Sequence, residues 1–313
     1  ILAAKELGLR VTITRGSMSL GETQGGLPPD KVIQSEETIL EDSERAIRTY
    51  HDQKDGSYSQ VALAPCSPFS VTSELMKATS HLAQKYGVRM HTHLAETEEE
   101  TAFCSKKFGL RPLDYLESVG WLKDSVWLAH GIHFSKQEIL KLGESNVGIS
   151  HCPSSNMILG SGICPASAME QAGCALGIGV DGSASNDGSN MIQELRMAFL
   201  LRRLADGAEN VSHNDVLRWG TSGSAACLGR SDIGEIALGK QADLALFALD
   251  EPRFSGHDDP LAAILTCGSH QAAYVMVGGE WRVKRGGIVD FDLDQMVAEH
   301  RTAAKRLILR AIN

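Results

Sequence analysis

Three absences narrow what this 313-residue sequence can encode. No apolar run is long enough to span a bilayer and no charged-then-apolar leader opens the chain, so we expect no membrane partner. Basic residues are not in excess: the formal net charge is −9, which disfavours nucleic acid as a partner because such binding neutralises phosphates. No Gly-x-Gly-x-x-Gly or Walker-type loop occurs. A phosphate-binding open sheet is therefore disfavoured.

Paired cysteine motifs are also missing. The seven cysteines are scattered and none forms a Cys-x-x-Cys pair, which predicts reduced thiols and a cytoplasmic location. The chain starts at Ile1 without an initiator methionine, inside what resembles the end of a helix that stops at Gly8. We therefore expect part of the domain to precede residue 1.

What the sequence does contain is a regular alternation of strand-like and helix-like segments. Hydrophobic residues make up 42% and charged residues 22%, as in an ordinary globular enzyme with a sizeable core. Six segments are short, apolar or β-branched, and each precedes a helical or loop segment. These predicted strands are residues 9–16, 61–66, 91–96, 125–130, 147–151 and 175–181.

Strands that alternate with helices predict a parallel sheet with helical crossovers, which makes the fold class α/β. We favour a (β/α)8 TIM-like barrel, with a doubly wound open sheet as the alternative. Residues 1–230 would then hold barrel strands three to eight, and the first two strands would lie upstream. Residues 231–292, with a Gly-Gly hairpin, predict a small β-sandwich portion, and residues 293–313 predict a closing helix.

Titratable side chains stand where several of these strands end. His93, His130, His151 and Asp181 occupy such positions, and the carboxyl ends of barrel strands form the active-site face. Three imidazoles and a carboxylate suit zinc or a similar divalent metal. Glu96, one turn beyond His93, could transfer protons without being a ligand. The same pattern also fits histidines buried in a barrel core, and for His151 a role in fixing a loop is preferred.

These motifs together resemble the amidohydrolase superfamily, in its zinc aminohydrolase and chlorohydrolase branch. The resemblance rests on His93-Leu94-Ala95-Glu96, His130, the segment 151–156 and the segment 180–187, and it extends over essentially the whole chain. It implies one divalent metal ion, expected to be zinc. His93 and Asp181 would be metal ligands, and Glu96, His130 and Asp181 would be catalytic.

One departure from the family pattern concerns its first two ligands. The resemblance implies a His-x-His pair at the tip of strand one, and no such strand precedes the predicted strand 9–16. His91-Thr92-His93 has the same spacing but stands at strand five. The chain as given therefore offers part of a metal site, with the remaining ligands expected upstream.

Substrate selection is expected from loops at the same face. The segments 15–21, 25–30 and 64–70 resemble the 8-oxoguanine deaminases, which implies hydrolysis of 8-oxoguanine to urate and ammonia. Arg15, Cys66 and His130 are the expected substrate-binding residues, although Arg15 fits a surface ion pair equally well.

Other functions stay open at this point. Deamination of isoxanthopterin or guanine and a triazine-type chlorohydrolase activity are alternatives, and a non-catalytic barrel scaffold is a remote one. We expect a small heterocyclic base as the ligand and a homo-oligomeric assembly.

Overall fold

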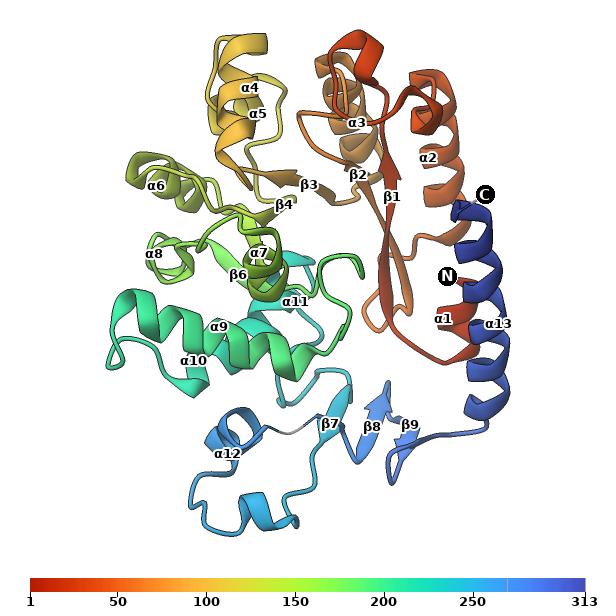
Figure 1. Ribbon diagram of the computed structural model, residues 1–313, viewed down its shortest axis with the longest axis vertical. Helices are drawn as coiled ribbons and strands as arrows, with labels where there is room; N and C mark the ends of the chain where they lie inside the picture. The colour runs from red at the N-terminus through yellow and green to blue at the C-terminus, as the bar shows by residue number, and fades with distance from the viewer. Residues whose placement is uncertain (269, 313) are drawn as a thin grey trace.

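The computed structural model describes residues 1–268 and 270–312. Its centre is a six-stranded parallel sheet in the order β1-β2-β3-β4-β5-β6, so each strand lies beside the next strand of the chain (Figure 1). The strands are β1 (Val11–Ser17), β2 (Ser59–Pro65), β3 (Met90–Leu94), β4 (Val126–His130), β5 (Gly148–His151) and β6 (Ala175–Ile178). This confirms the predicted α/β class and the parallel sheet.

Helices connect consecutive strands and cover the outer face of the sheet. Ile39, Ser43 and Ile47 of α2 recur every four residues and are buried, which gives that helix one face toward the sheet. Polar residues set the helix ends: Thr72 caps α3, Thr97 caps α4, and Ser135 forms a capping box with Glu138 at α6. The helices of this region are α1 (Leu2–Glu6), α2 (Glu36–Tyr50), α3 (Ser73–Tyr86), α4 (Glu98–Phe108), α5 (Pro112–Ser118), α6 (Lys136–Glu144), α7 (Pro153–Leu159), α8 (Ala166–Gln171), α9 (Met191–Asp206), α10 (His213–Arg218) and α11 (Ser224–Cys227).

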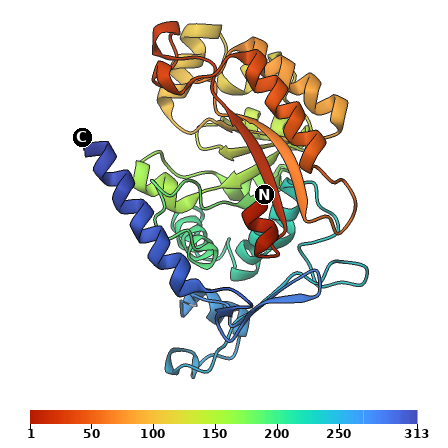
Figure 2. The ribbon, with the colours of Figure 1, turned by 90° about the vertical axis from the view of Figure 1, so that its right-hand side faces the viewer.

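A small antiparallel sheet follows in the order β10-β9-β8-β7. Its strands are β7 (Leu244–Leu246), β8 (Tyr274–Val277), β9 (Glu280–Lys284) and β10 (Gly287–Ile288), with α12 (Pro260–Thr266) between β7 and β8. The helix α13 (Leu293–Ile312) then runs along the outside of the molecule (Figure 2). No helix within the described residues is long and apolar enough to cross a membrane.

The described residues form the predicted parallel sheet and one small sheet, but they do not form a closed barrel or a two-layered sandwich. β1 and β6 are the two edges of the parallel sheet in the part of the chain that the structure describes, so closure into a barrel stays a prediction. The tail supplies one small sheet, and a second layer of a sandwich is not formed by the described residues. The domain limits at 230 and 292 likewise stay predictions.

Two buried arginines fasten the tail to the loop before β2. Arg230 makes two 2.7 Å hydrogen bonds to Asp232, and this carboxylate also accepts the backbone N–H of Gly56 at 2.7 Å. Arg10 donates to the carbonyl of Gly56 at 2.6 Å and pairs with Asp243, next to β7, at 2.7 Å. The hydrogen bond to Arg230 holds the pKa of Asp232 well below its usual range. This clamp fixes the small sheet against the amino ends of the parallel strands.

Asp232→Asn should lower the free energy of unfolding by about 3 kcal/mol or more, because it leaves the buried Arg230 without its counter-charge. The exposed Asp250→Asn is the control and should change stability little. Because the folded state depresses the pKa of Asp232, its contribution should also be lost as pH falls below the ordinary carboxyl range. Urea unfolding at several pH values measures both effects, and equal midpoints for the two variants would contradict the role of the clamp.

Candidate metal centre

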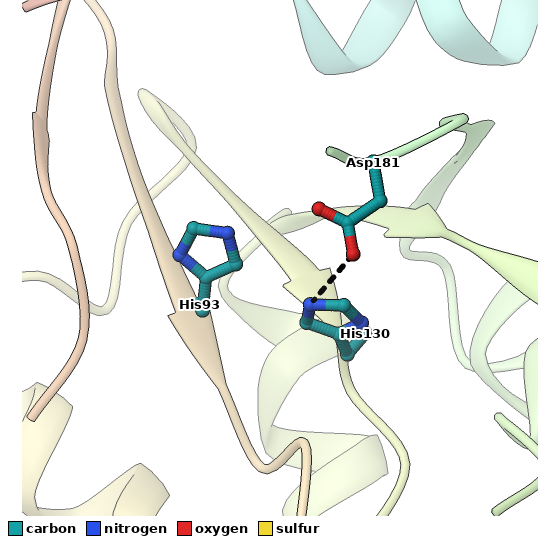
Figure 3. A group of neighbouring side chains, drawn as sticks. All are labelled: His93, His130 and Asp181. Atoms are coloured by element: carbon teal, nitrogen blue, oxygen red, sulfur yellow. Dashed lines mark ion pairs between the residues drawn. The ribbon is translucent and has the colours of Figure 1, made fainter. Parts of the chain in front are cut away.

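Three predicted residues meet at the carboxyl end of the parallel sheet. His93 belongs to β3, His130 ends β4, and Asp181 follows β6 (Figure 3). One potential ligand atom from each lies within 4.8 Å of the others. The Nε2 atom of His130 is 3.9 Å from Oδ2 of Asp181 and 3.6 Å from Oε2 of Glu96. The structure therefore brings together four of the predicted site residues.

The backbone at these strand ends is unusual. Ala95, His130 and Asp181 have φ values of 53°, 70° and 62°, in the left-handed region that residues other than glycine rarely adopt. Strained conformations of this kind persist only where the surrounding structure imposes them, and they cluster at functional sites. Here they turn the chain where β3 and β4 end and in the loop after β6, and two of these residues, His130 and Asp181, belong to the cluster.

The tautomer of each imidazole follows from its hydrogen bonds. Nδ1 of His93 lies 2.6 Å from the carbonyl oxygen of Cys66, and Nδ1 of His130 lies 2.9 Å from Oδ1 of Asn156. Each partner is an acceptor, so each Nδ1 carries a proton, and in the neutral ring each Nε2 keeps its lone pair. Histidines that bind metals are commonly oriented in this way by a second hydrogen bond.

Asp181 is held in its ionised form. Ser155 donates to its Oδ2 at 2.5 Å, and Ser185, itself bonded to Ser155 at 2.8 Å, lies 3.4 Å from the same oxygen. Burial raises the pKa of Asp181, but the hydrogen bonds from Ser155 and the backbone of Gly182 outweigh it and lower the pKa below its usual value. The carboxylate is thus ready to bind a cation.

The electrostatics of the cluster favour positive charge. Burial lowers the pKa of His93, yet the hydrogen bonds and charge of Cys66, with the charge of Asp181, raise it to about 9. A place that stabilises an imidazolium would also stabilise a metal cation, which would then displace the proton. Two imidazoles with free Nε2 atoms and one ionised carboxylate are a donor set that fits zinc or a similar divalent ion. The residues present therefore fit a metal, although they are fewer than a complete set of ligands.

Glu100 supports Glu96, the residue predicted to transfer protons, and its contact was not predicted from the sequence. Its buried carboxylate accepts the backbone N–H of Ala95 at 2.8 Å and that of Glu96 at 3.3 Å. Burial, only partly offset by those two bonds, raises its pKa to about 7. It fixes the turn that carries Glu96. A Glu in the first turn of a helix is common because it interacts favourably with the helix dipole, so no sequence signal points to this contact.

A cavity of about 620 Å³ opens beside the cluster. Its lining comes from β1, the loop after it, β2 and β3: Thr14, Gly16, Ser17, Met18, Val32, Gln34, Ala64, Cys66, His91 and His93. His91 shares the face of His93, as the strand period predicts, and stacks on the buried Trp127 with ring centres 4.7 Å apart. The predicted residue Cys66 thus borders the cavity together with a candidate ligand.

The structure does not place Arg15 in this cavity. Thr14 and Gly16 line it, and because side chains alternate along a strand, Arg15 points to the opposite face. There it pairs with Asp42 of α2 at 2.6 Å, which is the ion-pair alternative. Its NH2 group also donates to Gln34 at 3.0 Å. Gln34 lines the cavity, so Arg15 is connected to the cavity only through Gln34, a residue that was not predicted.

His151 does not join the cluster either. It is fully buried, and within the described residues neither ring nitrogen has a hydrogen-bond partner. Burial, with the nearby charges of Arg202 and His130, lowers its pKa to about 3, so it is neutral. The neighbouring segment acts instead through Asn156, which orients His130, and Ser155, which contacts Asp181.

Comparison with known proteins places the chain in the amidohydrolase family, because residues 1–282 match the family model. It is 60% identical over 304 residues to an 8-oxoguanine deaminase of Pseudomonas aeruginosa, which covers 97% of this chain and 68% of the relative. An isoxanthopterin deaminase of an unknown prokaryote is 31% identical over 99% of the chain and 68% of its own length. Among solved structures, a zinc complex of atrazine chlorohydrolase from Arthrobacter aurescens matches with a TM-score of 0.93 and 34% identity, over 96% of this chain and 67% of that one. The chain spans about two thirds of the length of these relatives.

Ser155→Ala should weaken metal binding by roughly 10- to 100-fold, because Asp181 loses the hydrogen bond that favours its ionised form. Ser154→Ala, one residue away, is the control, because no side-chain hydrogen bond links Ser154 to the cluster in the described structure. Competition with a chromophoric chelator measures the affinity. Equal affinities for the two variants would show that Ser155 does not tune Asp181.

Proposed function

We propose that this protein is a metal-dependent hydrolase that deaminates 8-oxoguanine to urate and ammonia. The observation that carries the proposal is the 60% identity to the 8-oxoguanine deaminase of Pseudomonas aeruginosa, which extends over 97% of the chain. The geometry supports it, because a metal-ligating cluster, a carboxylate and a cavity of suitable size for a planar base adjoin one another.

Zinc is the metal we propose, by similarity to the zinc complex of atrazine chlorohydrolase. His93 and Asp181 would hold it, together with ligands from outside the segment 1–313, and His130 would lie against it. When bound, such an ion lowers the pKa of a water molecule toward neutrality and so supplies the nucleophile at neutral pH. The other roles belong to side chains of this chain.

Hydrolysis forms a C–O bond at the carbon that carries the exocyclic amine and breaks its C–N bond, which releases ammonia. We propose that Asp181 accepts a proton from the attacking water and passes it to the departing amine. Glu96 donates a proton to the ring nitrogen beside the attacked carbon, so the negative charge of addition does not build up on the ring, and it recovers a proton from the new hydroxyl as the C–N bond breaks and the carbonyl forms. His130, whose Nδ1–H is held by Asn156, presents Nε2 to the water and keeps it in line for attack.

The acidic net charge of the protein agrees with a free base rather than a nucleotide as substrate. Cys66 and Gln34 are the cavity residues we propose to contact the base. Gln34 accepts a hydrogen bond from Arg15 through Oε1, so its amide N–H groups are left to donate, for instance to a ring carbonyl. Deamination of isoxanthopterin is the second candidate, favoured by the 31% identity over 99% of the chain.

Glu96→Gln should leave metal content near that of the wild type and lower kcat by roughly 10²-fold or more, the usual cost of losing a general acid–base group. Glu98→Gln, exposed on the first turn of α4, should behave as wild type. Elemental analysis and single-turnover assays of the full-length protein separate the two effects. A Glu96→Gln variant that lost metal but kept its activity per bound metal would overturn the assignment.

The substrate is tested by comparing kcat/KM of the full-length protein on 8-oxoguanine, guanine, isoxanthopterin and cytosine. A site that pairs buried polar groups with the 8-carbonyl should prefer 8-oxoguanine over guanine by about 10² or more, because guanine leaves those groups unpaired. Equal or better efficiency on guanine or isoxanthopterin would reject 8-oxoguanine as the substrate and leave the hydrolytic roles of Glu96 and Asp181 standing.

A further inference from the structure

A second cavity, of about 610 Å³, lies at the opposite end of the parallel sheet from the candidate metal centre. Its lining includes Thr12 and Gln60 near the starts of β1 and β2, and Arg89 and Ser125 just before β3 and β4. None of its lining residues belongs to the cavity beside His93. The two cavities are therefore separate, and the proposed reaction makes no use of this one.

Two cationic side chains border this second cavity without forming an ion pair, although the charge of Asp124 acts on both. Arg89 uses NH2 to donate to the carbonyl of Asp124 at 2.9 Å, but its buried Nε–H has no partner within the described residues. Lys123 donates to the hydroxyl of Ser80 at 2.8 Å. Neither cation forms an ion pair with any described residue, including Asp124, which also lines the cavity. Half-buried cations are normally paired, so this arrangement suits an anionic ligand.

His51 adds a neutral donor to the same cavity. The backbone N–H of Val61 donates to its Nδ1 at 3.0 Å, so the ring proton is on Nε2. This Nε2–H is buried and has no partner in the described part of the chain. Burial lowers the pKa of His51, which keeps the ring neutral and preserves that tautomer. The residues that line the cavity therefore carry a guanidinium N–H and an imidazole N–H that have no partner, and an ammonium.

We propose that this cavity is a binding site for a small oxyanion, a phosphate or a carboxylate group, held by Arg89, Lys123 and His51. An oxyanion presents several acceptor oxygens, and charge-assisted hydrogen bonds from Arg and Lys are the strong ones. Such a ligand would join the connections that precede β2, β3 and β4, and so act on the sheet from the end remote from the candidate metal centre. The inference does not depend on the proposed deaminase activity.

The test is a titration of the full-length, metal-free protein with inorganic phosphate and, separately, with citrate, at constant ionic strength set by chloride. Isothermal calorimetry gives the affinity, and ¹H–¹⁵N spectra of arginine Nε–H groups locate the ligand. We expect saturable binding of at least one of these anions and a shift of the Arg89 Nε–H signal. Arg89→Gln and Lys123→Gln should each weaken binding by about tenfold or more, and Lys77→Gln, exposed on α3, should not.

The two anions distinguish a phosphate site from a carboxylate site, and either result supports the proposal. If Arg89→Gln does not fold, as judged by circular dichroism, Lys123→Gln decides. The proposal is overturned if neither anion binds above the chloride background, or if both the Lys123→Gln and Lys77→Gln variants bind as the wild type does. Because no substrate or metal is present, this outcome is independent of any failure to deaminate 8-oxoguanine.

Discussion

The candidate metal centre depends on the hydrogen bonds that the carbonyl oxygen of Cys66 accepts. This oxygen accepts the backbone N–H of His93 at 3.0 Å, the Nδ1–H of the same residue at 2.6 Å, and the hydroxyl of Thr92 at 3.2 Å. The sheet ladder between β2 and β3 holds a single register pair, Leu63 with Met90. At their carboxyl ends these strands are therefore joined by bonds that also fix the ring of His93. One oxygen thus sets both strand spacing and the direction of the Nε2 lone pair.

The other residues of the centre are also oriented by hydrogen bonds to buried neighbours. Asn156 sets the tautomer of His130, Ser155 keeps Asp181 ionised, and Glu100 holds the turn before α4. These partners come from the segments that follow β3 and β5, so the geometry needs the parallel order of strands to bring them together. The left-handed conformations of Ala95, His130 and Asp181 are maintained by this packing rather than by local preference.

Much of the fold could be predicted because its signals are local. Apolar strand segments and the Gly-Gly turn are each set by neighbouring residues. The predicted strand 175–181 was too long at its end, since β6 stops at Ile178 and a loop carries Asp181. The short helices α7, α8 and α12 were missed. Each is seven residues or fewer, which is too short for a clear helical period.

The site residues that could be predicted are those at or near the ends of strand-like segments. His93, Glu96, His130 and Asp181 all ended strand-like segments, and the structure brings them together. The position of Arg15 was harder to predict. The face of the sheet on which a side chain lies depends on strand register, and a shift of one residue moves it to the other face. The sequence could not predict the roles of Glu100, Gln34 and Ser155, because each acts through a contact that exists only in the folded chain.

The position of the metal ion decides whether His93 and Asp181 form a metal site. Zinc-loaded crystals of the full-length protein, measured on both sides of the zinc absorption edge, give an anomalous difference map that identifies the ion and its position. We predict one peak per protomer at about 2 Å from Nε2 of His93 and from a carboxylate oxygen of Asp181, with His130 beside it. An active enzyme whose zinc lies elsewhere, or that hydrolyses its substrate with no metal at these residues, would contradict it.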